Sequence, residues 1–307
     1  MRRLVRETVV RPSQLVLPAF VADEPGAISS MPGVERHTPD GVAHLAEQVA
    51  AAGLGGIMLF GVPRDDAKDD RGSQAWEPDG ILQRGLRACR AAVGDDTVVM
   101  ADTCLDEFTS HGHCGFLTAD GEVDNDATLA GYVSMALAQA EAGAHVVAPS
   151  GMMDGQVEAI RAGLDGEGRT DVAILAYAAK YASAFYGPFR EAVTSSLKGD
   201  RRTYQQDPAN RREGLREAEL DLAEGADMVM VKPASHYLDV LADVAEVSDV
   251  PVAAYQVSGE YAMLEAAADR GWIDRRPAIK ESVTAIVRAG ADVVLTYWGL
   301  ELAAWLR

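Results

Sequence analysis

The chain has 307 residues, with 28 Lys and Arg against 47 Asp and Glu, so its formal net charge is −19. This acidic balance argues against a sequence-independent nucleic-acid binder or a binder of anionic membranes, because both need basic surfaces. No stretch approaches the roughly 18 apolar residues of a membrane span, and no apolar signal-peptide segment follows residues 1–7. Three cysteines are too few for a disulfide framework, so we expect a reducing, cytoplasmic setting.

Short apolar runs recur along the chain, and amphipathic stretches separate them. The runs are rich in Val, Ile and Ala, and most are apolar on both faces, which is typical of a parallel sheet covered by helices. The predicted strands are 15–21, 56–62, 97–102, 145–150, 172–177, 227–231, 251–257 and 292–296. The predicted helices between them include 41–52, 129–142, 210–224 and 278–289.

The eight repeating units predict an α/β fold, a single (β/α)8 TIM barrel. Several helices are predicted to stop at a glycine, such as Gly53 and Gly225, which can take the left-handed conformation that ends a helix. A doubly wound open sheet shows the same alternation, but the first strand is followed by no Gly-x-Gly-x-x-Gly motif. We therefore predict a barrel over residues 15–307, preceded by a short N-terminal arm over residues 1–14.

Two of the five lysines end predicted strands. Lys180 and Lys232 close the fifth and sixth strands, where a barrel places its active site. Two buried ammonium groups are unfavourable unless one loses its proton, and a neutral lysine condenses with a ketone or aldehyde to form an imine. The alternative is that each pairs with a carboxylate at the barrel rim. Lys68, by contrast, lies in the charge run 64–71, which we expect to be a solvated loop.

The longest excursion, residues 181–226, follows the fifth strand and predicts an active-site lid. It carries Arg190 and Arg201, and arginine binds carboxylates in a two-pronged geometry. We expect Arg211, Arg212 and Arg216, on the following helix, to pair with local acids instead. Together, the lysines and the lid predict an imine-forming enzyme that acts on a small keto acid.

A cluster of metal-ligand residue types follows the third strand. Its members are Cys104, Asp106, His111, His113 and Cys114. The spacing is not that of a zinc finger, but a catalytic zinc needs only three protein ligands. A metal-free reading stays open, in which Cys104 packs at the strand end and Asp106 caps the loop.

Segments distributed over the whole chain resemble the porphobilinogen synthase family, also called 5-aminolevulinate dehydratase. They are residues 31–34, 110–115, 148–150, 154–155, 183–192, 199–205, 207–213, 230–234, 254–263 and the region of Tyr297. The resemblance implies a (β/α)8 barrel without an organic cofactor. It also implies condensation of two 5-aminolevulinate molecules to the pyrrole porphobilinogen, with loss of two waters, in haem biosynthesis.

The resemblance also implies roles for single residues. Lys232 matches the lysine that forms a Schiff base with the substrate of the propionate side, and Lys180 matches the lysine that holds the other substrate. Asp102 is a candidate for proton transfer, and Glu217 matches the carboxylate of an allosteric magnesium site at a subunit interface. The residues that match carboxylate clamps are Ser258 and Tyr297 for the first substrate, and Arg190, Arg201 and Gln205 for the second.

The chain departs from the family pattern in its metal loop. Zinc members carry three cysteines there and magnesium-type members carry Ala or Asp, whereas this chain combines Cys104, Asp106 and Cys114. Two thiolates favour zinc by their softness. We predict a zinc site with both cysteines as ligands, completed by Asp106 or water. Gly151 stands where many members carry Asp or Ala, and the sequence assigns no effect to it.

The N-terminal arm is shorter than in most members, whose arm wraps a neighbouring subunit. A short arm removes part of the area that would stabilise an octamer. We therefore predict a homo-oligomer and leave octamer, hexamer and dimer open.

Two other classes of function remain. A barrel aldolase or decarboxylase would use one imine lysine, and a paralogue of the family would act on a related amino ketone or small keto acid. A non-catalytic barrel would serve as a scaffold or metal store. The second lysine opposes the aldolase, and the lid with its carboxylate clamps opposes the scaffold.

Overall fold

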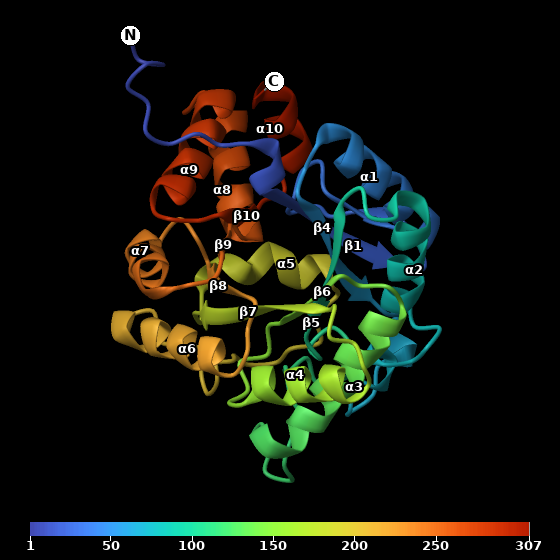
Figure 1. The fold of residues 1–307 in the computed structure, drawn as a ribbon. Helices are drawn as coiled ribbons and strands as arrows, with labels where there is room; N and C mark the ends of the chain where they lie inside the picture. Colours follow the sequence, from blue (N-terminus) through green and yellow to red (C-terminus); the bar gives the residue numbers. More distant parts are fainter. Residues whose placement is uncertain (307) are drawn as a thin grey trace.

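The structure is a computed structural model that describes residues 1–306. Eight parallel strands follow one another around a closed barrel, in which the last strand pairs with the first, and this confirms the predicted (β/α)8 fold (Figure 1). The barrel strands are β1 (Leu15–Ala22), β4 (Gly56–Val62), β5 (Val98–Thr103), β6 (Val146–Pro149), β7 (Ala173–Lys180), β8 (Met228–Lys232), β9 (Val252–Tyr255) and β10 (Val293–Leu295). Two short strands, β2 (Gly26–Ala27) and β3 (Glu35–His37), extend the sheet beside β1.

Helices separate the strands and lie around the barrel (Figure 1). They are α1 (Pro39–Ala52), α2 (Ile81–Val93), α3 (Asn125–Glu141), α4 (Gln156–Gly166), α5 (Gly187–Ala192), α6 (Arg211–Ala223), α7 (Leu238–Val247), α8 (Ser258–Asp269), α9 (Arg275–Arg288) and α10 (Gly299–Leu306). Four 3-10 turns are η1 (Pro12–Gln14), η2 (Asp65–Ala67), η3 (Ser73–Ala75) and η4 (Ala184–Tyr186).

The local sequence accounts for these elements. Every residue of β1 and β4 is buried, as expected for strands that face a packed barrel interior on one side and helices on the other. The Thr38 hydroxyl caps α1 by accepting a hydrogen bond from the Gly41 N–H at 3.1 Å. The helix ends at Gly53, whose φ of +75° is the left-handed conformation that glycine adopts without strain.

The chain before the barrel is exposed. Met1, Leu4 and Val5 have exposed fractions of 96%, 82% and 69%, and β1 begins at Leu15. The division into an arm and a barrel domain stays a prediction. Among residues 1–306, no helix combines the length and apolar character needed to cross a membrane.

Candidate active site

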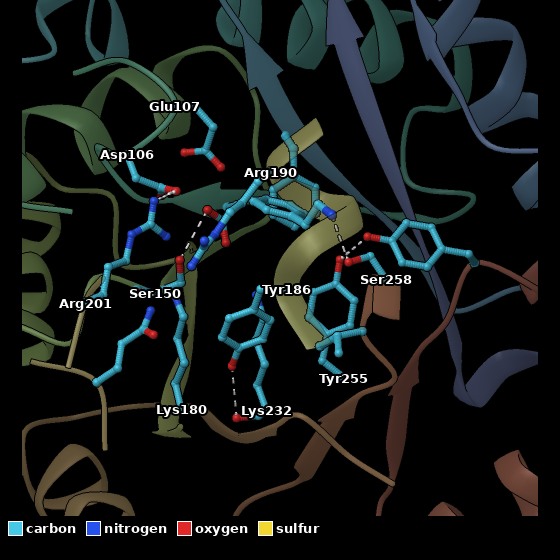
Figure 2. A pocket seen from close by; sticks show the side chains of 16 residues that line it. Asp106, Glu107, Ser150, Lys180, Tyr186, Arg190, Arg201, Lys232, Tyr255 and Ser258 are labelled. Carbon is cyan, nitrogen blue, oxygen red and sulfur yellow. Dashed lines mark hydrogen bonds and ion pairs between the residues drawn. The ribbon is translucent and has the colours of Figure 1, made fainter. Parts of the chain in front are cut away.

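The two lysines of interest lie directly beside each other. Lys180 ends β7, Lys232 ends β8, and their Cα atoms are register partners between these neighbouring strands. Both are buried and line one pocket at the C-terminal ends of the barrel strands, as Figure 2 shows. The same pocket is lined by Asp102, Asp106, Arg190, Arg201, Gln205, Ser258 and Tyr297. The structure therefore brings together in one cavity most of the site residues that the sequence singled out.

Aromatic rings surround the Lys232 amine. Its Nζ lies 4.6 Å from the ring centre of Tyr255 and 4.9 Å from that of Tyr177, with Tyr186 and Phe189 each at 5.4 Å. Burial among these rings, followed by the charge of Lys180, lowers the pKa of Lys232 to about 7. A large share of this lysine is therefore the uncharged nucleophile at neutral pH.

Lys180 has different surroundings. Its Nζ donates a hydrogen bond to the backbone carbonyl oxygen of Ser150 at 2.5 Å. This partner is not the carboxylate at the barrel rim that the alternative interpretation of the sequence expected. Burial acts to lower the pKa of Lys180, but the negative charges of Cys114, Cys104 and nearby carboxylates outweigh it and raise that pKa. One lysine of the pair is thus held charged while the other is near its neutral form.

Asp102 lies near the end of β5 and is buried. Its Oδ2 accepts a hydrogen bond from the Ser150 hydroxyl at 3.2 Å, and its Oδ1 has no partner among the described residues. Burial raises the pKa of Asp102 to about 6, although the charges of Lys232 and Lys180 act in the opposite direction. A carboxyl with a pKa near neutrality is suited to exchanging protons in the pocket.

Two of the predicted carboxylate-binding side chains lie beside β9 and β10. The Ser258 Oγ accepts a hydrogen bond from the Phe189 N–H at 2.9 Å, and the Tyr297 hydroxyl lies 3.0 Å from that of Tyr255. Arg190 reaches the pocket from α5, on the side opposite the lysines (Figure 2).

Arg201 forms a buried ion pair within the pocket. Its Nη2 lies 2.7 Å from Asp106 Oδ2 and 2.7 Å from the Gly112 carbonyl oxygen. Asp106 is distant from this arginine in sequence but enters the same pocket from the loop after β5, so the predicted carboxylate-binding arginine already has one carboxylate partner within the chain. The ion pair is buried, since the side chains are only 9% and 5% exposed. Arg211 pairs with Asp243 of α7 at 2.6 Å, as expected, whereas Arg212 and Arg216 form no ion pair within 4.0 Å among the described residues.

The cysteine loop forms a compact donor group. One ligand atom from each of Cys104, Asp106 and Cys114 lies within 4.8 Å of the others, and all three residues are buried. Two sulfur donors and a carboxylate are a donor set that suits zinc. His111 and His113, candidates on pattern alone, are engaged elsewhere: His111 Nε2 lies 3.1 Å from the Asp70 carbonyl oxygen and His113 Nδ1 lies 3.1 Å from the Tyr204 hydroxyl.

Gly151 gains a structural explanation. A Cβ at this position would lie 1.7 Å from the Tyr132 hydroxyl oxygen, so a glycine leaves the space that this hydroxyl fills. The hydroxyl donates to the Cys114 carbonyl oxygen at 2.8 Å and lies 3.6 Å from Cys104 Sγ. Gly151 therefore allows a tyrosine on α3 to brace the cysteine loop.

Sequence reasoning missed Glu107. Its side chain lines the pocket and is buried, and neither carboxylate oxygen has a hydrogen-bond partner among the described residues. Burial, with the charges of Asp106 and Asp102, raises its pKa well above the usual range. The available signal was a carboxylate in the loop that follows β5, four residues after the strand ends, because such loops line the active site of a barrel. The other missed lining residues are Phe60, Ser150, Tyr186, Phe189, Tyr255 and Val257.

Glu217 lies apart from this pocket. It is on α6 and lines a separate cavity with Glu213 and Asp154. Partial burial, together with the charges of these two acids, raises the pKa of Glu217.

Comparisons with known proteins place the chain in a family. The model of the family described as delta-aminolevulinic acid dehydratase matches residues 1–305. Proteins of that name from Mycobacterium tuberculosis and Streptomyces coelicolor are 66% and 65% identical to this chain, covering all of it and 94% of each relative. A crystal structure of the Toxoplasma gondii delta-aminolevulinic acid dehydratase (porphobilinogen synthase), in complex with the reaction product porphobilinogen, superposes with a TM-score of 0.97 at 46% identity, covering 99% of this chain and 88% of that one. This chain belongs to the delta-aminolevulinic acid dehydratase family.

Proposed function

We propose that this protein is a porphobilinogen synthase, which condenses two molecules of 5-aminolevulinate to porphobilinogen with loss of two waters. The observation that carries the proposal is the register pairing of Lys180 and Lys232 in one buried pocket. The pKa of Lys232 is lowered and that of Lys180 is raised, so one amine is ready to attack while the other is still charged. Two lysines in one pocket support a reaction through two imines, whereas an aldolase that forms one imine needs a single lysine.

Imine formation begins at the neutral amine. Lys232 Nζ attacks the keto carbon of one substrate, and loss of water leaves a Schiff base that makes the neighbouring C–H acidic. Lys180 first gives up a proton, for which Asp102 is the proposed acceptor, and then forms the second imine with loss of the second water. The acidic carbon of one substrate attacks the imine carbon of the other, and the free amine of one substrate attacks the remaining imine carbon. Both lysine amines leave as their bonds to the substrates break, and loss of a ring proton gives the aromatic pyrrole.

Polar groups around the lysines have matching roles in this scheme. Ser258 and Tyr297 would hold the carboxylate of the first substrate, while Arg190, Arg201 and Gln205 would hold that of the second. Arg201 would contribute while still paired with Asp106, through the guanidinium Nε that has no partner among the described residues. Asp102, with a pKa of about 6, would take up and return protons beside both amines.

Family membership fits a metal-dependent enzyme, and we propose zinc as the metal of the cysteine loop. Cys104 and Cys114 would hold it, with Asp106 or water completing the site. When bound there, zinc supplies Lewis acidity beside the pocket. We further propose an allosteric magnesium ion at Glu217, a homo-oligomeric assembly and a cytoplasmic location, the last in keeping with the three free thiols.

The direct test incubates purified protein with 5-aminolevulinate and measures porphobilinogen colorimetrically, before and after treatment with a zinc chelator. We expect product formation that chelation abolishes and added zinc restores. Absence of product from metal-replete protein would refute the proposed reaction. Product formation that survives complete zinc removal would refute only the zinc assignment.

A further inference from the structure

The lid helix α5 is held to the barrel by a carboxylate that faces away from the pocket. Glu191, next to Arg190 in sequence, accepts hydrogen bonds from Ser29 and Ser30 of the segment after β1. The Ser29 N–H and hydroxyl donate at 2.9 and 2.5 Å, the Ser30 N–H donates at 3.2 Å, and the Ser30 hydroxyl also donates. One carboxylate thus joins the lid to residues about 160 positions away.

A second anchor holds the chain just beyond the end of α5. Lys68 Nζ donates to the Thr194 carbonyl oxygen at 2.8 Å and lies 3.3 Å from the Thr194 hydroxyl and 2.9 Å from Asp65. Its side chain is only 2% exposed, so the expectation of a fully solvated loop was wrong for this residue. Thr194 has a φ of +48°, a conformation that a non-glycine residue keeps when surrounding contacts hold it.

The two segments that contact α5 and Thr194 are themselves held in place by burial and hydrogen bonds. Buried Ile28 and Met31 flank the two serines, at 2% and 0% exposure. On the other side, the Asp69 carbonyl oxygen, next to Lys68, accepts the Ser110 N–H at 2.7 Å and so ties this loop to the cysteine loop. Contacts to fixed segments can set the position of a short helix, which a mobile partner could not do.

We propose that Lys68 and Glu191 are positioning residues that hold α5 over the pocket and thereby set Arg190 for the substrate carboxylate. The inference rests on the proposed function, since it takes the ligand of Arg190 to be a carboxylate of 5-aminolevulinate. Neither Lys68 nor Glu191 lines the pocket. Each acts through the helix, which delivers Arg190 and Phe189 into the cavity.

The test compares Lys68→Met and Glu191→Gln with the matched variants Lys198→Met and Glu246→Gln, whose side chains are exposed. Loss of a charge-assisted hydrogen bond is expected to raise KM for 5-aminolevulinate about tenfold with a smaller change in kcat. Lys68→Arg should restore part of the loss. In an Arg190→Ala background neither substitution should raise KM further, because the arginine through which they act is gone.

Hydrogen exchange of residues 187–194 provides a readout that does not depend on activity. We expect faster exchange there in Lys68→Met and Glu191→Gln than in the wild-type protein or the matched variants. Unchanged exchange and KM, or effects that add fully to those of Arg190→Ala, would overturn the proposal. If the wild-type protein makes no porphobilinogen, the proposed function fails while the exchange result still decides whether the anchors hold α5.

Discussion

Lys232 and Lys180 share a residue type and a register, yet their surroundings favour opposite charge states. Aromatic rings enclose Lys232, whereas Lys180 donates to a carbonyl and faces the negative charges of the cysteine loop. Because their pKa values shift in opposite directions, Lys232 is the amine that attacks first, and Lys180 remains a cation until it gives up a proton. The chemistry at the residue scale therefore follows from the neighbours of each amine.

The rate at which Lys232 forms an imine should rise with pH around neutrality. A pKa of about 7 means that the uncharged fraction increases about tenfold between pH 6 and pH 8. We expect borohydride-trapped adduct on the Lys232 peptide, measured by mass spectrometry at short times, to increase accordingly. A rise centred near the ordinary lysine value of 10.5 would contradict the low pKa.

Replacing Gly151 by Ala should destabilise the protein. The new methyl would meet the Tyr132 hydroxyl, and overpacking of this kind costs about 1–3 kcal/mol. Urea unfolding should show the loss against Gly166→Ala, at the end of α4, where no atom lies within 4 Å of an added Cβ. Equal stability of the two variants would show that Tyr132 moves aside without cost.

The sequence was sufficient to predict the position of residues that lie at the end of a barrel strand. Lys180 and Lys232 each end an apolar run, and a barrel brings all such ends to one face. The Arg201–Asp106 pair and the Tyr132–Gly151 contact join positions 95 and 19 residues apart. Local pattern contains no information on such pairings, so they required the structure.

At the scale of elements, the Arg201–Asp106 ion pair joins the lid to the cysteine loop. Burial alone would raise the pKa of Asp106, but the charges of Arg201 and Lys180 lower it well below its usual value. A carboxyl whose pKa is lowered by folding stabilises the protein above its unfolded-state pKa, near 4, and loses that contribution as pH falls. The lid and the loop are thus coupled most strongly near neutral pH.

Asp106→Asn should therefore weaken this connection. Removing one partner of a buried ion pair costs about 3–5 kcal/mol, and here it would leave the buried guanidinium of Arg201 without its carboxylate, so we expect a loss of about that size. The measurement is urea unfolding of chelator-treated protein at pH 7. Asp66→Asn is the control, because its pair with Arg64 is exposed and should contribute less than about 1 kcal/mol. Equal effects of both substitutions would exclude a structural role for the buried pair.

The elements themselves were largely predictable. Strands buried on both faces produce uninterrupted apolar runs, and glycine at helix ends separates them from the helices, as at Gly53. The position of α5 was not predictable, because contacts from Ser29 and Lys68 in distant loops hold that helix, and its own six residues contain no such signal.

At the scale of the whole molecule, the exposed arm predicts assembly. Met1, Leu4, Val5 and Val9 are apolar and more than half exposed, as is common for side chains that bury against another copy. We expect light scattering at micromolar concentration to show an oligomer, and deletion of residues 1–9 to give a smaller species. A monomeric full-length protein, or a deletion without effect on size, would contradict this.

The central claim is that both lysines form imines with the same small keto acid. Borohydride reduction in the presence of 5-aminolevulinate, followed by mass-spectrometric peptide mapping, tests it most directly. We predict reduced adducts on Lys232 and on Lys180, with loss of the Lys232 adduct in Lys232→Met and a fall in kcat on the order of 10⁴-fold or more. A reduced adduct on neither lysine, in protein that still makes porphobilinogen, would contradict the account.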